Sequence, residues 1–318
     1  MPPMLPDGRR LGAHLPLAAG MVKAADRAHA IGADAIQIFT DNPTAWRRRT
    51  DPPAELAAFR ECLVVHDIRP IAIHAAYLVN LAGHDPMLFA SSVEVLSHEL
   101  RGAPSFAARF VNVHIGSHKD SGIASGIERV GEGVALALAE VDAGPEAAML
   151  VLENSAGSGW GVGTNIDELA AIAEAIDRRG VAAHRVGFCL DTAHAWAAGI
   201  DLSEPTTIDA FLTEFDARIG LDRLVMVHLN DSRSERGSRL DRHEHLGAGR
   251  IGAVGLAHVL RHPGLAHATY LLETPGMDEG YDAINLQRAR RLIAGEPLDA
   301  LPAAAFELRS SRARTAPA

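Results

Sequence analysis

The chain has 318 residues, a formal net charge of −10, 47% hydrophobic residues and 22% charged residues. This composition is typical of a globular protein with a large core, and the acidic balance, taken alone, argues against a broad nucleic-acid-binding surface. No apolar stretch approaches the roughly 20 residues that cross a bilayer, and the N-terminal sequence lacks the apolar segment of a secretory signal. The two cysteines, Cys62 and Cys189, exclude a disulfide framework and a cysteine-based zinc site. We therefore expect a cytoplasmic protein that does not contact membranes.

Eight short apolar runs predict strands, because a continuous apolar run of this length fits a strand buried on both faces. The intervals between them contain helical patterns, such as residues 53–65 after a start at Asp51, and residues 166–176 with Asn165 as the expected N-cap. Alternating strands and helices imply parallel pairing with right-handed crossovers, and eight such units fit a closed (β/α)₈ TIM barrel. The predicted strands begin near Leu11, Ala35, Ile71, Phe110, Met149, Val186, Leu224 and Thr269.

No long linker divides these units, so we expect one α/β domain over residues 10–295. Residues 1–9 are rich in proline and are expected to be flexible. Residues 296–318 are rich in alanine and proline, carry Arg309, Arg312 and Arg314, and are expected to form a disordered tail.

Six of the apolar runs end in His, Asp or Glu, and three further candidates lie just beyond such runs. The strand ends of a (β/α)₈ barrel converge on one face. His, Asp and Glu side chains at these ends supply nitrogen and oxygen ligands that zinc or manganese accepts. Nine ligands exceed the need of one tetrahedral ion, so the pattern predicts two or three ions with a bridging carboxylate, suited to phosphoryl displacement. The nine candidates are His74, His114, Glu153, Asp191, His194, His228, Asp241, His243 and Glu273.

From about Leu11 to beyond Glu273, the sequence resembles the endonuclease IV family of zinc-dependent apurinic/apyrimidinic endonucleases. All nine ligand positions of that family are filled by the expected residue types. The resemblance implies a single-domain barrel of the xylose isomerase-like kind. The matching segments include residues 74–81 (HAAYLVNL), 112–118 (NVHIGSH), 152–157 (LENSAG), 190–195 (LDTAHA), 227–232 (VHLNDS) and 237–247 (GSRLDRHEHLG).

The resemblance also implies three zinc ions, with manganese as an alternative at some of the sites. The first ion would be held by His74, His114 and Glu153, and Glu153 would bridge to the second. The ligands of the second ion would be completed by Asp191, His228 and Glu273. The third ion would be held by His194, Asp241 and His243. Glu153 and Glu273 are the residues assigned most directly to catalysis.

The implied reaction is hydrolysis of the phosphodiester 5′ to an abasic site in duplex DNA, giving a 3′-hydroxyl and a 5′-deoxyribose phosphate during base excision repair. Such an enzyme would work at the nucleoid in the cytoplasm, and no protein partner is implied. Tyr77 and Leu78 match the family residues beside the abasic nucleotide. Arg47 begins an Arg-Arg-Arg run on the same face, which is either a phosphate contact or a solvated charge run.

The sequence differs from the family pattern in two segments that would contact DNA. Many members carry Asn-x-Arg-x-Trp after the second strand, whereas residues 42–46 read Asn-Pro-Thr-Ala-Trp, with Thr44 in place of the arginine. The common Gly-Glu-Gly is replaced by Gly-Ala-Gly at residues 247–249. Residues 247–252 fit the G-x-G-x-x-G pattern, but they follow a His- and Asp-rich loop instead of a strand, so we reject dinucleotide binding.

Two other functions are open at this point. A sugar isomerase or epimerase of the xylose isomerase-like barrels needs one or two divalent ions, held mainly by carboxylates, and five ligand histidines exceed that need. A metal-dependent DNA-binding module without activity is the third hypothesis, although open zinc positions would serve no purpose in it. For His14 and His118, a functional role (support of the metal ligands or a hydrogen bond to a phosphate) and a purely structural role are equally compatible with the sequence.

Overall fold

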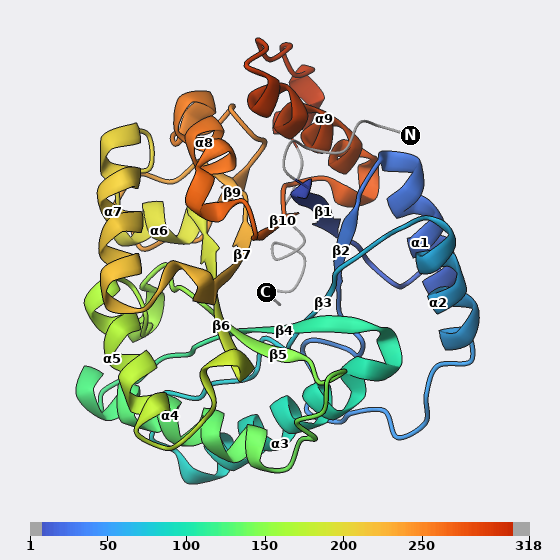
Figure 1. Ribbon diagram of the computed structural model, residues 1–318. Coiled ribbons are helices and arrows are strands. Elements are labelled where there is room, and N and C mark those ends of the chain that lie inside the picture. Colours follow the sequence, from blue (N-terminus) through green and yellow to red (C-terminus); the bar gives the residue numbers. More distant parts are fainter. Residues whose placement is uncertain (1–7, 308–318) are drawn as a thin grey trace, which may run out of the picture.

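The computed structural model describes residues 8–307, in which eight parallel strands close into a barrel surrounded by helices (Figure 1). Around the barrel the strands follow the order β1, β2, β3, β4, β5, β6, β7 and β10, and β10 pairs with β1 to close it. This confirms the predicted (β/α)₈ barrel. The strands are β1 (Arg10–His14), β2 (Ala35–Ile38), β3 (Ile71–His74), β4 (Ala108–His114), β5 (Met149–Glu153), β6 (Val186–Asp191), β7 (Leu224–His228) and β10 (Thr269–Leu272).

The helices of the described residues lie outside the barrel and cover it on all sides (Figure 1). One connection, between β6 and β7, contains two α-helices, because a short helix follows β6 directly. The helices are α1 (Met21–Ile31), α2 (Leu56–Val65), α3 (Pro86–Gly102), α4 (Ile123–Ala139), α5 (Ile166–Asp177), α6 (Thr192–Ala198), α7 (Pro205–Arg218), α8 (Gly252–Arg261) and α9 (Tyr281–Ala294).

The strands are buried on both faces, which explains their continuous apolar sequences. Close approach of neighbouring strands needs a glycine at one point: a Cβ on Gly12 in β1 would lie 1.7 Å from the carbonyl oxygen of Ala35 in β2.

A capping side chain marks the start of α5. Asn165 accepts a hydrogen bond from the backbone of Glu168, and this confirms the predicted N-cap of α5.

The connection between β7 and β10 carries a small hairpin at the carboxyl end of the barrel. Its strands, β8 (Asp231–Ser232) and β9 (His243–Glu244), pair antiparallel, and residues 233–242 link them. In the connection after β6, Asp191 Oδ1 accepts a hydrogen bond from the backbone N–H of His194 at 2.8 Å and so caps α6. These two connections place polar side chains above the strand ends.

The described parts of both ends of the chain lie against the barrel. Arg9 is buried and donates a hydrogen bond to the carbonyl oxygen of His262 at 2.9 Å. The expected tail starts at residue 296, and its described part, residues 296–307, accepts hydrogen bonds from Arg288 at the carbonyl of Asp299 and from His245 at the carbonyl of Ala305. The rest of both expected flexible ends, residues 1–7 and 308–318, lies outside the described residues. In residues 8–307, no helix is both long and apolar enough to cross a membrane.

Candidate metal centre

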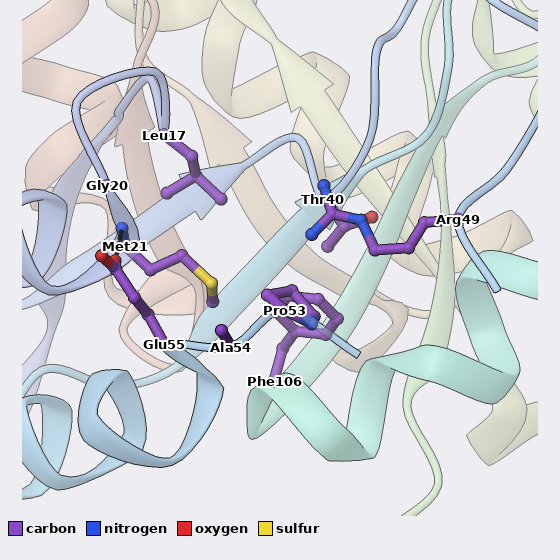
Figure 2. Close-up of a pocket in the computed structure, with 9 residues that line it drawn as sticks. All are labelled: Leu17, Gly20, Met21, Thr40, Arg49, Pro53, Ala54, Glu55 and Phe106. Carbon is purple, nitrogen blue, oxygen red and sulfur yellow. Dashed lines mark hydrogen bonds between the residues drawn. The ribbon is translucent and has the colours of Figure 1, made fainter. Parts of the chain in front are cut away.

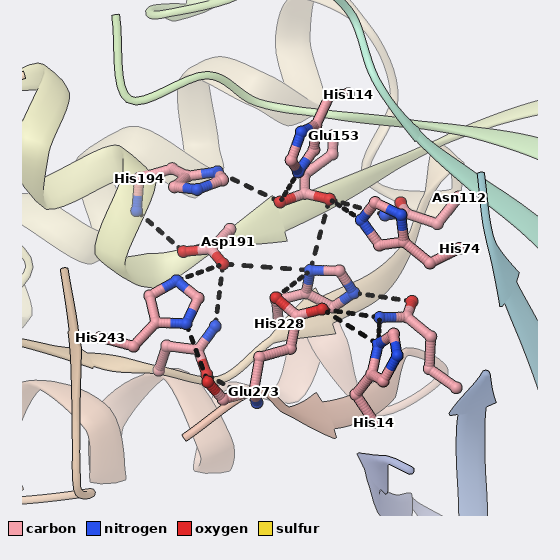
Figure 3. Close-up of polar contacts among 12 residues, drawn as sticks. His14, His74, Asn112, His114, Glu153, Asp191, His194, His228, His243 and Glu273 are labelled. Carbon is pink, nitrogen blue, oxygen red and sulfur yellow. Dashed lines mark hydrogen bonds and ion pairs between the residues drawn. The ribbon is translucent and has the colours of Figure 1, made fainter. Parts of the chain in front are cut away.

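The nine side chains predicted as metal ligands lie together at the carboxyl end of the barrel. Figure 3 shows these ligands with the exception of Asp241, which lies beside His243 and His194. Barrel closure brings them together from distant parts of the chain. Five are the last residues of their strands: His74 (β3), His114 (β4), Glu153 (β5), Asp191 (β6) and His228 (β7). The other four are Glu273 directly after β10, His194 in the first turn of α6, Asp241 in the hairpin loop and His243 in β9.

Eight of these residues form three overlapping groups, and in each group one ligand atom per residue lies within 4.8 Å of all the others. Glu153 belongs to the first and second groups, and Asp191 to the second and third. A carboxylate shared by two groups can bridge two cations, so the arrangement suits three adjacent sites. The groups are His74, His114 and Glu153; Glu153, Asp191, His228 and Glu273; and Asp191, His194 and His243.

The Glu153 carboxylate is the centre of the first two groups. Its Oε2 lies 3.6 Å from His74 Nε2 and 3.4 Å from His228 Nδ1, and its Oε1 lies 3.6 Å from His114 Nε2. Ligand atoms of one tetrahedral zinc ion are about 3.3 Å apart, given zinc–nitrogen and zinc–oxygen distances near 2 Å. The spacing around Glu153 is therefore close to that of a metal shell.

The third group differs in one respect from the expected ligand set, because Asp191 belongs to it together with the two histidines. Asp241 lies beside it: its Oδ1 is 3.0 Å from His243 Nε2 and its Oδ2 is 3.5 Å from His194 Nε2. Asp191 Oδ2 lies 3.5 Å from the same His243 nitrogen. Two carboxylates and two imidazoles thus surround the third position.

Backbone carbonyls contact the rings of three of the histidines. The Nδ1 atoms of His74, His194 and His243 lie 2.7, 3.0 and 2.9 Å from the carbonyl oxygens of Ala75, Asn154 and Glu273, respectively. For His74 and His243 this contact fixes the tautomer, so the ring presents its Nε2 to the cluster. Nδ1 of His194 also lies 3.1 Å from Glu153 Oε1, so both nitrogens of this ring face the cluster. The rings are therefore oriented as ligands before any cation arrives.

Four amide side chains that we did not predict as functional support the carboxylates. Asn112 donates to Glu153 Oε2 at 2.6 Å, and Asn230 donates to Asp191 Oδ2 at 2.8 Å. Asn154 accepts a hydrogen bond from the backbone N–H of Asp191 at 2.6 Å. The fourth amide is Gln37, described next. The only sequence signal for the asparagines is that each lies within two residues of a ligand on a strand end.

Gln37 in β2 connects three residues at the second group. Its Nε2 donates to Glu273 Oε1 at 2.8 Å, and its Oε1 lies 3.0 Å from His228 Nε2. The same amide nitrogen lies 3.0 Å from Nδ1 of His14, which in turn lies 3.5 Å from Glu273. His14 therefore contacts the ligand shell, whereas His118 lies against Trp160, with ring centroids 5.7 Å apart.

Several buried polar atoms in the cluster form no hydrogen bond of good geometry, although each lies close to other candidate ligands. They include Glu153 Oε1, His228 Nδ1 and His243 Nε2. Buried polar atoms are nearly always paired, because an unpaired one costs on the order of 1–3 kcal/mol. All three atoms point toward other ligands of the cluster, so a bound cation would satisfy them. The residues present therefore fit a multinuclear metal centre.

The electrostatics of the cluster favour the same interpretation. Burial lowers the pKa of His114 to about 4, which keeps this imidazole neutral, as a metal ligand must be. Burial also acts against protonation of His243, but the carboxylates of Asp241 and Asp191 outweigh it and raise its pKa to about 9. Without a cation, such histidines serve as counter-ions for the carboxylates. A divalent cation would take over this role.

Tyr77, which the resemblance assigns to the abasic nucleotide, lies beside the first ligand group. Its ring centroid is 5.6 Å from that of His74 and 5.9 Å from that of His114, and 44% of the residue is exposed. Its backbone N–H donates to the carbonyl oxygen of Pro43 at 3.0 Å, which brings the β2–α2 loop to the mouth of the barrel. Thr44 follows in that loop and its hydroxyl donates to Asn42 Oδ1 at 2.8 Å.

Of the three consecutive arginines in this loop, two are paired within the protein. Arg48 reaches inward to Glu99 of α3 at 3.3 Å, and the two side chains are only 8% and 2% exposed. Arg49 pairs with Asp41 at 3.4 Å. Arg47 is exposed. The run is thus partly a loop anchor, and a phosphate contact by Arg47 stays a prediction.

A pocket of ≈ 220 Å³ lies beneath this loop (Figure 2). On one side of it, Glu55 Oε2 accepts a hydrogen bond from the backbone N–H of Met21 at 2.7 Å and satisfies the first turn of α1. The pocket contains none of the nine predicted ligands, so it is separate from the metal centre. Its lining residues are Leu17, Gly20, Met21, Thr40, Arg49, Pro53, Ala54, Glu55 and Phe106.

The glycine-rich segment 247–252 surrounds an anion that belongs to the protein. The Asp231 carboxylate accepts hydrogen bonds from the backbone N–H groups of Gly249, Ile251 and Gly252 at 3.0–3.3 Å. A Cβ on Gly249 would lie 2.5 Å from Asp231 Oδ1, which explains the glycine there. These N–H groups are therefore not available to a dinucleotide phosphate.

Comparison with known proteins agrees with this geometry. A family model described as "Xylose isomerase-like TIM barrel" matches residues 25–301. The chain is 40% identical to a probable endonuclease 4 of Methanoculleus marisnigri over 282 residues, 89% of this chain and 98% of that protein. The crystal structure of endonuclease IV from Thermus thermophilus has 39% identity and a TM-score of 0.77, and the match covers 90% of this chain and 99% of that one.

The barrel also resembles more distant structures. A D-tagatose 3-epimerase-like protein has a TM-score of 0.65 at 16% identity, with 90% of this chain and 99% of that chain covered, which shows a shared fold alone. The matches at 39–40% identity run over about nine-tenths of the chain and include the segments that carry the nine candidate ligands. On this evidence, the chain belongs to the endonuclease IV family.

Proposed function

We propose that the chain hydrolyses the phosphodiester 5′ to abasic sites in duplex DNA, leaving a 3′-hydroxyl and a 5′-deoxyribose phosphate, as a step of base excision repair. The observation that carries this proposal is the set of three ligand groups joined by Glu153 and Asp191. Adjacent cations suit in-line displacement at phosphorus, where negative charge develops on both the attacking and the leaving oxygen. Membership in the endonuclease IV family supports the same reaction.

The donor set fits zinc at three positions, with manganese as an alternative, because imidazole and carboxylate suit both metals. When bound, such cations supply Lewis-acid chemistry and lower the pKa of water. His74 and His114 would hold the first, with Glu153 shared with the second. Asp191, His228 and Glu273 would complete the second position. His194, Asp241 and His243 would hold the third, with Asp191 close by.

Neighbouring side chains fix the orientation of the metal-binding carboxylates and cover one side of the first ligand group. Asn112 and Gln37 hold Glu153 and Glu273 by hydrogen bonds at 2.6 and 2.8 Å, so each carboxylate keeps one orientation during the reaction. The Tyr77 ring covers the side of the first group and is positioned to rest against a nucleotide that lacks its base. We assign DNA contact to Tyr77, Leu78 and Arg47.

A sugar isomerase or epimerase is the second candidate, because distant structures with this fold include such enzymes. Those enzymes need one or two divalent ions, whereas three groups with five histidines are present in this barrel. The count of bound metal therefore separates the two functions. Elemental analysis near three metals per chain supports the nuclease, and one metal per chain supports the isomerase.

The decisive experiment is incubation with a duplex that carries one tetrahydrofuran abasic analogue. We expect a single cut 5′ to the analogue, lost after strong chelation and restored by zinc or manganese. The same duplex with an ordinary nucleotide at that position is the control. Absence of cleavage by metal-loaded protein, or equal cleavage of the undamaged duplex, would contradict the proposal.

A further inference from the structure

Trp160 is exposed on the same face of the barrel as the metal centre, in a conformation that is unfavourable for a tryptophan. It is 66% exposed, more than any other Trp, Tyr or Phe in residues 8–307. Its φ of 68° lies in the left-handed region, which is rare for bulky residues. Backbone strain together with an exposed apolar ring is a combination that recurs at functional sites.

The backbone around Trp160 is firmly held, so the exposed ring is not the tip of a loose loop. The carbonyl oxygen of Trp160 accepts a hydrogen bond from the backbone N–H of His118 at 3.1 Å, and Ser117 forms an antiparallel bridge with Gly161. The Ser117 hydroxyl also donates to the carbonyl oxygen of Gly159. The loop after β5 is thus fastened to the loop after β4, and the indole is held in position.

Both loops continue directly from candidate ligands of the first group. Trp160 follows Glu153 on the β5 connection, and its partners Ser117 and His118 follow His114 on the β4 connection. The carboxyl ends of both strands face the mouth of the barrel. A duplex whose phosphodiester reaches Glu153 must therefore pass close to this loop.

Two exposed cationic residues lie on segments that border the Trp160 loop. Lys119 follows His118 and is exposed. The side chain of Arg239, in the β8–β9 loop, lies against the Trp160 loop: its Cγ is 3.6 Å from the position that a Cβ on Gly157 would occupy, and the residue is exposed. The nearby acid, Asp120, lies 3.5 Å from His84. An exposed aromatic ring on a face that also carries cations suits a nucleic-acid strand, because bases stack on the ring while the cations meet phosphates.

We propose that Trp160 is a DNA-contacting residue whose indole stacks on a base flanking the abasic nucleotide, and that it supplies stacking that Thr44 in the β2–α2 loop does not provide. The inference rests on the proposed function, because it takes duplex DNA with an abasic site as the occupant. It assigns Trp160 to substrate binding only, with no part in the hydrolysis.

The test compares Trp160→Ala and Trp160→Phe in the full-length, metal-loaded enzyme. Stacking on an aromatic side chain contributes about 1–3 kcal/mol per base. We therefore expect Trp160→Ala to raise KM for the tetrahydrofuran duplex about tenfold or more, with kcat within twofold, and Trp160→Phe to recover most of the affinity. Val64→Ala is the matched control, since Val64 is an exposed apolar residue in the last turn of α2.

A second readout does not depend on activity. Binding of the nicked product duplex is followed by fluorescence anisotropy over a range of salt concentrations. Trp160→Ala should weaken binding about tenfold without changing the salt dependence, because the indole carries no charge. Lys119→Ala should instead reduce the slope of log binding constant against log salt concentration by about 0.9.

The outcomes separate this inference from the proposed function. If Trp160→Ala binds and cleaves as the wild type does, the inference is wrong while the proposed function stands. If the wild type fails to cleave, the proposed function itself is wrong. A dimer in sedimentation that Trp160→Ala dissociates would assign the ring to a second copy of the chain and overturn the inference.

Discussion

The metal centre and the loops that face DNA are built by different means, although they share one end of the barrel. The candidate ligands lie mainly at strand ends and are mostly buried, and the sequence resemblance implies that they fill the family's ligand positions. The surrounding loops use Arg48 as a buried anchor and expose Trp160. The sequence resemblance places Thr44 of these loops where many family members carry arginine. Strand ends fix side chains within a rigid frame, whereas loops tolerate change. We therefore expect the metal ligands to be constrained by the fold, and this chain to differ from its relatives mainly in the loops that would bind the substrate.

The largest effect should follow substitution at the residue shared by the first two ligand groups. Glu153→Gln replaces a carboxylate with a neutral amide of the same size, and an amide is a poor bridging ligand. We expect turnover of the abasic duplex to fall at least about a hundredfold, with circular dichroism showing an intact fold. More than a third of wild-type activity in the pure variant would contradict the bridging assignment, and the metal centre would then be less constrained than the loops.

The third metal position should be separable from the other two. Asp241→Ala and His243→Ala should each remove one metal per chain and leave about two, because both residues belong to the β8–β9 hairpin and not to a barrel strand. Elemental analysis of each purified variant is the measurement, and Arg242→Ala in the same hairpin is the control. An unchanged stoichiometry in both variants would mean that Asp191 and His194 suffice to hold this position.

The sequence predicted the barrel and the meeting of the strand-end residues, because parallel strands in a closed barrel have one possible carboxyl-end face. His194, Asp241 and His243 lie beyond strand ends, so only the resemblance to a family assigned their roles. The amides were missed: Gln37 is one polar residue in the apolar strand Ala35–Ile38, and nothing local shows that it points at Glu273. The direction of the Gln37 side chain depends on the register of the strands and on the closure of the barrel.

The loops were predicted less well, for a different physical reason. In the sequence, Arg48 looks like one of three equivalent surface arginines. Its partner Glu99 lies in α3, far from Arg48 in the sequence. Burial raises the pKa of Glu99, a sign that this ion pair lies inside the protein. The exposure of Trp160 depends on a left-handed backbone and on contacts with the next loop. Neither feature follows from local sequence.

A smaller effect is expected at Gln37, which touches the metal centre without being a ligand. Gln37→Met keeps the length of the side chain but removes the hydrogen bonds to Glu273 and His228. Loss of such supporting contacts typically costs about 10- to 100-fold in metal affinity. Competition with a chromogenic zinc chelator measures this, and Gln37→Glu tests whether an acceptor for His228 is enough. If Gln37→Met keeps wild-type affinity, the strand ends alone orient the ligands.

The smallest effect should come from restoring the arginine that the β2–α2 loop lacks. Position 44 lies next to the mouth, because Pro43 accepts a hydrogen bond from the backbone of Tyr77, and Thr44 itself only reaches Asn42. An arginine there can stack in the opened duplex and meet a phosphate, whereas threonine does neither well. Thr44→Arg should therefore lower KM a few-fold and leave kcat nearly unchanged, and Thr44→Val should change neither.

Removing the neighbouring ring should act in the opposite direction. Tyr77→Ala should raise KM, because we propose that the tyrosine rests against the extruded nucleotide. Steady-state cleavage of the tetrahydrofuran duplex at two salt concentrations measures both variants, and the benefit of Thr44→Arg should shrink at high salt, where phosphate contacts weaken. If Thr44→Arg leaves binding unchanged or weakens it, the β2–α2 loop does not enter the duplex. Recognition of DNA would then rest on Arg47 and on the loop that carries Trp160.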